Sequence, residues 1–164
     1  MLDTVPARPR WALAAQEADK LTKNYSKPPI PVRRIAEDSG IDVVFADFGK
    51  HSDSVAGFCD FSRAKLFVNR LDKTDRQSFT IAHELGHWIL HRALFIANPT
   101  KYPVLPRYTM PNHDDPLEKE ANHFAANLLV PKHLLEPVKN ASVSSLAQAF
   151  GVSVTMMSFR VRNA

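Results

Sequence analysis

The sequence predicts a small domain of the α+β class, in which a short antiparallel sheet packs against two helices. Apolar residues recur at helical spacing in several separate stretches, while two short aromatic and aliphatic runs surround the polar SRAK (residues 62–65), as in a β-hairpin. The chain has 164 residues, 45% of them hydrophobic, which is enough to bury one core. We therefore expect helices and a sheet to share that core.

The first part of the chain predicts two helices and a strand. Apolar positions at helical spacing predict a helix over 11–24, which ends at the prolines of SKPPIP (26–31). VRRIAEDSG (32–40) predicts a short helix closed by Gly40, and IDVVFADF (41–48) predicts the strand that follows it. The hairpin at 56–69 comes next.

A helix that contains TIAHELGHWILH (80–91) is predicted after the hairpin. Asp72, Thr74 and Asp75 are candidates for its N-cap, because their side chains accept hydrogen bonds from free backbone N–H groups. Uncharged residues flank its histidines on nearly every side, so we expect the helix to be buried.

The remainder of the chain predicts a long loop and three further helices. Five prolines between residues 92 and 116 exclude a long helix there, and we expect a loop that is either a functional lid or disordered. LEKEANHFAANLLV (117–130) predicts a helix that Pro131 ends, and 142–161 predicts two short helices around Gly151, with Ser153 capping the second. We expect residues 1–137 to form the main domain and 138–164 a helix-turn-helix-like appendage.

Composition predicts the cellular compartment of the protein and the classes of partner that it does not bind. The single cysteine, Cys59, excludes an internal disulfide, and with no apolar leader it predicts a cytoplasmic protein. No apolar run reaches membrane-spanning length, so no membrane partner is expected. A net charge of +4 is too mild to predict nucleic acid binding.

The HELGH sequence predicts a metal site. His83 and His87 are four residues apart, so on a helix both imidazoles project from one face and can bind the same Zn²⁺ ion. Glu84 lies close enough to act as a general base on a metal-bound water without being a ligand. The alternative is an ordinary core helix whose histidines bind backbone carbonyls.

A catalytic zinc site needs a third protein ligand. Ala93 stands where a metzincin has its third histidine, which excludes that class, and His91 on the same helix is interpreted as a packing or supporting residue. Glu120 is predicted as the ligand, because helical phase puts it at the inner edge of the apolar stripe and Glu118 further toward solvent. His123 is the nearest competitor.

The hairpin, HELGH, EKEANHFAANLLVP (118–131) and LAQAFGVS (146–153) occur in an order that resembles the ImmA/IrrE family of bacterial and phage metallopeptidases. The resemblance extends from about Pro28 to the end. It implies a small zincin-like, gluzincin-type zinc endopeptidase, with Zn²⁺ bound by His83, His87 and Glu120, and Glu84 as catalytic base.

The resemblance also implies a substrate. Members of the family typically accompany a separate helix-turn-helix repressor of the Xre type or an antitoxin-like regulator, whose cleavage releases prophage, mobile-element or stress genes. The sequence contains neither the fused Xre domain nor the C-terminal sensor domain found in some members, so we expect any repressor to be a separate protein. The alternative is a non-catalytic regulatory module, related to toxin-antitoxin systems, that binds protein or DNA.

The C-terminal helices predict at most weak DNA binding. Val154, Thr155 and Met156 occupy the positions where a recognition helix would read bases, and Arg160 and Arg162 come late enough to contact only phosphates. Packing or protein docking is the favoured role.

Substrate contacts are predicted elsewhere in the chain. Tyr102, Tyr108 and His113 are candidates of equal weight for stabilising an oxyanion. The edge of the hairpin is a candidate for binding an extended peptide by β-augmentation.

Overall fold

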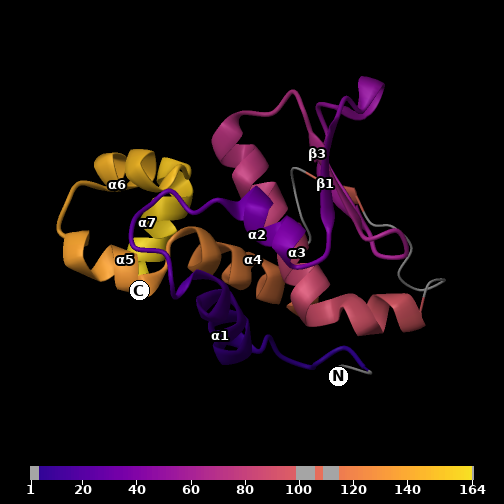
Figure 1. Cartoon of the computed structure of the whole chain (residues 1–164), viewed down its shortest axis with the longest axis horizontal. Coiled ribbons are helices and arrows are strands. Elements are labelled where there is room, and N and C mark those ends of the chain that lie inside the picture. Colours follow the sequence, from indigo (N-terminus) through magenta and orange to yellow (C-terminus); the bar gives the residue numbers. More distant parts are fainter. Residues whose placement is uncertain (1–3, 99–105, 109–114, 164) are drawn as a thin grey trace.

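The computed structural model describes residues 4–98, 106–108 and 115–163. The elements in these ranges are α1 (Trp11–Thr22), α2 (Val32–Asp38), β1 (Asp42–Ala46), η1 (Gly49–His51), β2 (Val55–Asp60), β3 (Lys65–Asn69), α3 (Thr74–Ala97), β4 (Pro106–Tyr108), α4 (Pro116–Leu129), α5 (Lys132–Leu135), η2 (Glu136–Val138), α6 (Val143–Phe150) and α7 (Val154–Arg162). The predicted α+β class is confirmed. The sheet lies at one end and α5–α7 at the other, with α3 and α4 between them (Figure 1).

The sheet has the strand order β1-β3-β2-β4. β2 and β3 form the predicted antiparallel hairpin, but β1 pairs with β3 in parallel, so the sheet is mixed rather than purely antiparallel. The parallel pair arises because the hairpin folds back and inserts β3 between β1 and β2. β3 is thereby the strand that carries the fully buried Leu66 and Val68.

Both outer edges of the hairpin are paired in the described part of the chain. β1 covers β3, and β4 lies antiparallel to β2 from Val55 to Phe58. The edge predicted to take an extended peptide is therefore occupied by a strand of the same chain.

β2 packs closely on α3 at Gly57. A Cβ atom built on this residue would lie 2.5 Å from the carbonyl oxygen of Phe67 and 2.6 Å from Cγ2 of Thr80. Such distances are shorter than van der Waals contact, so only glycine lets the sheet approach the helix this closely.

Gly57→Ala is expected to lower the free energy of unfolding by about 1–3 kcal/mol, because the added methyl group must displace backbone or a buried side chain. Urea unfolding followed by circular dichroism measures the change. An unchanged urea midpoint would mean that β2 and α3 are not packed as described.

α3 is longer than predicted and begins differently. It runs on to Ala97, past the expected start of the loop at Arg92, and its N-cap is Lys73, which makes no capping hydrogen bond through its side chain. α4 begins at Pro116 and is capped by Asp115, whose carboxylate accepts a hydrogen bond from the N–H of Leu117. None of the described helices combines the length and the apolar character needed to cross a membrane.

α3 and α4 pack against each other at Gly86, the glycine of HELGH. A Cβ atom there would lie 3.0 Å from Cδ1 of Phe124 and 3.2 Å from Cα of Ala121. The missing side chain lets the two helices come close at the level of His83 and His87. Residues of α4 can therefore reach the histidines of α3.

The C-terminal helices have the predicted form. Ser142 and Ser153 cap α6 and α7, and Gly151 ends α6 with φ of 69°. Phe150 and Met157 belong to the same buried cluster as Leu128 of α4.

Arg160 does not face solvent as the sequence suggested. It is 5% exposed, and its Nε donates to the carbonyl oxygen of Val130 at 3.0 Å. Its guanidinium stabilises the end of α4, so it is withdrawn from any phosphate contact.

Candidate metal centre

The two histidines of HELGH lie on one buried face of α3. His83 is 1% exposed and His87 is 5% exposed, and their ring centroids are 4.8 Å apart. Burial of two imidazoles side by side requires a polar or charged partner, because each has lost its water.

That partner is Glu118 in the first turn of α4. Its Oε2 lies 3.0 Å from Nε2 of His83, and its Oε1 lies 2.9 Å from Nε2 of His87. Donor atoms of these three residues all lie within 4.8 Å of one another, a separation suitable for one metal ion. Four tetrahedral ligands at the usual Zn–N and Zn–O lengths lie roughly 3.3 Å apart, so a small movement of Glu118 would admit the ion.

The structure differs from the sequence prediction at the third ligand. Glu120 is fully buried, as predicted, but its carboxylate binds Arg10 and His91 and does not join the cluster. Helical phase identified the inward-facing glutamate correctly. It did not predict that Glu118 contacts the histidines. The glutamate side chain is long, and from the first turn of α4 it reaches them at the rim of the helix interface.

Each of the two histidines has its Nδ1 atom held by a second residue. Nδ1 of His83 lies 2.7 Å from Oδ1 of Asn122, and Nδ1 of His87 lies 2.9 Å from Nδ1 of His91. An amide oxygen only accepts, so Nδ1 of His83 carries a proton. Without a cation Nε2 must carry a second one, because it lies against Glu118, which also only accepts; a bound cation would replace that proton and leave the neutral ring with its lone pair on Nε2. This tautomer is the one a metal ligand requires, and the residues present therefore fit a bound cation.

The electrostatics of the site agree with a ligand role for Glu118. Burial alone raises the pKa of this carboxyl, but hydrogen bonds from His83 and His87 outweigh it and hold the pKa well below its usual range. Burial lowers the pKa of His87, and the bond and charge of Glu118 reverse the shift, so that this pKa is raised. The carboxylate stays ionised and favours a cation at the two imidazoles.

Glu84 lies beside this cluster and is 3% exposed. Its negative charge adds to the rise in the pKa of His87, and after burial it is the next cause of the raised pKa of Cys59 on β2. Glu84 is therefore near both His87 and the sheet. Its position is compatible with the predicted role of base.

The other predicted site residues are only partly placed. Tyr102 and His113 lie outside the described residues, and Tyr108 is described only as backbone of β4, paired with Val55. His123 is not part of the cluster: its ring packs edge-on against Trp11 at 5.1 Å, and burial lowers its pKa.

The sequence contains a signal that points to Glu118 and Asn122. They are four residues apart on α4, the same spacing as His83 and His87 on α3, and such pairs share one helix face. Two helices that cross with matching pairs can place a ligand and its supporting residue together. This pair was not predicted, because its position relative to the apolar stripe of α4 placed Glu118 toward solvent.

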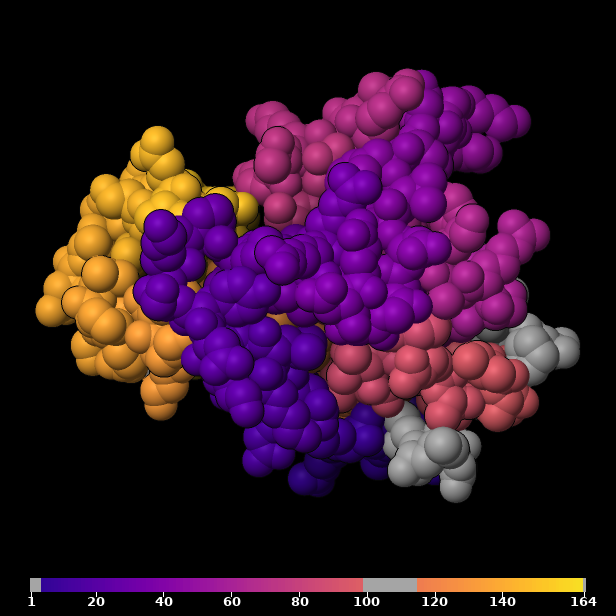
Figure 2. Space-filling model, in the orientation of Figure 1, coloured from indigo at the N-terminus to yellow at the C-terminus, as the bar shows by residue number. Residues whose placement is uncertain are grey.

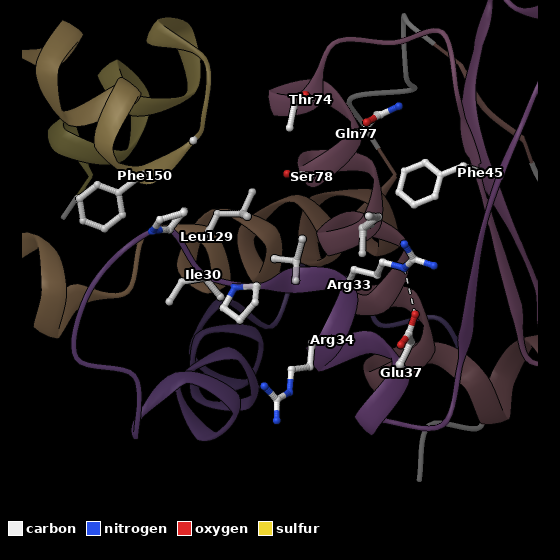
Figure 3. Close-up of a pocket in the computed structure, with 15 residues that line it drawn as sticks. Ile30, Arg33, Arg34, Glu37, Phe45, Thr74, Gln77, Ser78, Leu129 and Phe150 are labelled. Carbon is white, nitrogen blue, oxygen red and sulfur yellow. Dashed lines mark hydrogen bonds and ion pairs between the residues drawn. The ribbon is translucent and has the colours of Figure 1, made fainter.

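A separate hollow of about 480 Å³ lies between α2, the start of α3 and the end of α6 (Figure 3). Its wall is mostly apolar and includes Ile30, Leu129 and Phe150. Arg33 lies at its rim, where it pairs with Glu37 at 3.0 Å and stacks over Phe45. Of the predicted site residues, those whose side chains the structure describes do not line it.

Comparison with solved structures shows a related fold. The chain is similar to a Mycobacterium tuberculosis transcriptional regulator, with a TM-score of 0.65 and 17% sequence identity over 90% of this chain. It covers 54% of that protein's chain. No match is found among the curated proteins.

The family comparison is decisive. The family model Peptidase_M78, described as the IrrE N-terminal-like domain, matches residues 36–162, which include α3, α4 and all residues of the metal cluster. The resemblance noted from the sequence is thereby confirmed, and the chain belongs to the family of IrrE N-terminal-like peptidase domains.

Proposed function

We propose that the protein is a zinc-dependent endopeptidase whose substrate is a separate helix-turn-helix repressor of the Xre type or an antitoxin. The observation that carries the catalytic part is the convergence of His83, His87 and Glu118 on one point, with Glu84 beside them. Three ligands from protein leave one position open, as in catalytic rather than structural zinc sites.

The protein residues have distinct roles in this proposal. His83, His87 and Glu118 would bind Zn²⁺, which when present lowers the pKa of water and polarises a carbonyl group. Glu84 accepts a proton from the attacking water and returns it to the nitrogen of the leaving amine. Asn122 and His91 keep the imidazoles in the orientation that their Nε2 atoms need.

The substrate class rests on the family and not on geometry. Family members typically accompany an Xre-type repressor, and the similar fold from Mycobacterium tuberculosis is named a transcriptional regulator. This chain spans about half of that protein's length.

Zinc-loaded protein is expected to cut a purified Xre-type repressor encoded beside its gene into defined fragments. Chelation with 1,10-phenanthroline should stop the reaction, and added Zn²⁺ should restore it. Mass spectrometry of the fragments identifies the cleaved bond. An intact repressor under all conditions, with one zinc bound per chain, would disprove the substrate; wild-type protein that binds no zinc would disprove the metallopeptidase.

A protein-docking role for the C-terminal helices is the second candidate. Val154 and Phe159 of α7 are 54% and 50% exposed, which is high for large apolar residues. With Arg160 buried, the exposed apolar side chains of α7 suit a protein partner better than DNA. Docking of a repressor there would be compatible with its cleavage.

A further inference from the structure

A chain of buried polar residues leads from the metal cluster to the N-terminal segment. It begins at His87, whose Nδ1 lies 2.9 Å from Nδ1 of His91. Nε2 of His91 lies 2.8 Å from Oε1 of Glu120, and Glu120 binds Arg10. His91 and Glu120 are both fully buried, so they have no water to replace a lost partner.

The hydrogen bonds from His87 through His91 to Glu120 have one consistent direction of donation. A carboxylate only accepts, so Nε2 of His91 donates to Glu120. The neutral ring then has a lone pair on Nδ1, which accepts the proton that His87 carries on its own Nδ1. Without a cation, Nε2 of His87 carries a proton that it donates to Glu118 at 2.9 Å. A bound cation would replace that proton and take the Nε2 lone pair.

Arg10 is the last residue in this series of hydrogen bonds, at the end away from His87. Three of its N–H groups donate to Glu120: the backbone N–H to Oε2 at 2.8 Å, Nε to Oε2 at 2.9 Å and Nη2 to Oε1 at 2.7 Å. With the bond from His91, Glu120 accepts four hydrogen bonds, which fills its acceptor positions. Loss of the Arg10 side chain would leave two of these four bonds, from its backbone N–H and from His91, and the buried carboxylate would lack its cationic partner.

Arg10 precedes α1 and lies outside the residues that the family model matches, 36–162. In Figure 2 the N-terminal third of the chain covers the centre of the visible face, between the C-terminal helices and the later turns of α3. The N-terminal segment is thus packed onto the domain that contains the metal cluster, and Arg10 is its contact with the buried polar chain.

We infer that Arg10 is a positioning residue for the metal site, which holds His87 in its ligand orientation through Glu120 and His91. This inference rests on the proposed metal site and deepens it. If Arg10 has this role, the N-terminal segment determines part of the metal affinity through a single arginine.

The test is the zinc dissociation constant of the full chain, measured by competition with a chromophoric chelator. Arg10→Ala should weaken zinc binding about tenfold and His91→Leu by about 10–100-fold, the usual effect of losing a residue that supports a ligand. The double variant should bind zinc no more weakly than His91→Leu alone, since Arg10 acts through His91. Additive losses would overturn the inference.

Two controls separate positioning from general loosening. Trp11→Ala removes the contact of the neighbouring residue with His123 but leaves the polar chain intact, so its zinc affinity should equal that of the wild type. His91→Gln should retain most of the affinity, because its amide has an acceptor and a donor like the neutral imidazole. The absorption spectrum of the Co²⁺ form should change in Arg10→Ala and not in Trp11→Ala.

The outcomes distinguish this inference from the proposed function. Wild-type protein without zinc affinity would remove the metal site and the inference together. Zinc binding by the wild type, with equal affinity in Arg10→Ala, would overturn only the role of Arg10. Equal losses in Trp11→Ala and Arg10→Ala would show that the segment matters as packing alone, which also overturns it.

Discussion

Glu84→Gln is expected to abolish repressor cleavage while the protein still binds one zinc per chain. Glutamine has nearly the same shape as glutamate but cannot accept the proton of the attacking water. Loss of a general base typically costs about 10²–10⁴-fold in rate. Because Glu84 is beside the cluster and not among its three ligands, metal binding should persist. Single-turnover cleavage and zinc titration on the same preparation measure both quantities.

Glu37→Gln is a matched control for this substitution. Glu37 lies on α2, where it forms an exposed ion pair with Arg33, so its replacement should leave both cleavage and metal binding unchanged. Cleavage by Glu84→Gln at the wild-type rate would contradict the role of base. Loss of zinc in Glu84→Gln would instead make Glu84 part of the coordination.

Local patterns were sufficient to predict most of the elements. The hairpin and the helices on either side of Gly151 follow from residue type and period alone, and the structure has them where expected. The parallel pairing of β1 with β3 was not predictable in this way, because pairing between distant strands depends on how the whole chain folds back.

At the site, the sequence was sufficient to predict the residues that lie on a single helix, because their spacing determines their relative positions. His83 and His87 share one face of α3, and Glu84 directly follows His83, so their spacing alone brings the three residues close. Which glutamate of α4 joins the histidines depends on how α3 and α4 cross, and the phase of α4 relative to its own apolar stripe does not fix that crossing. Arg10 was out of reach for the same reason, since it is 110 residues from its partner Glu120.

Glu118→Ala and Glu120→Ala are expected to have different effects, although the two residues are close on one helix. Glu118→Ala removes a ligand, so zinc affinity should fall by more than the roughly 100-fold caused by losing a supporting residue. The metal-free fold should lose less stability than in Glu120→Ala, because Glu118 is at the rim with 24% of its side chain exposed, and water can take its place beside the imidazoles. Zinc titration and urea unfolding in chelator measure the two effects.

Glu120→Ala should act mainly on the fold. It leaves the guanidinium of Arg10 and the buried His91 without their shared partner, and breaking a buried ion pair typically lowers the free energy of unfolding by about 3–5 kcal/mol. Leu71→Ala, an exposed apolar residue outside both networks, serves as the control and should change neither quantity. A stable Glu120→Ala protein that has lost all zinc binding, beside a Glu118→Ala protein that retains it, would restore Glu120 as the ligand and require α4 to rotate when the metal binds.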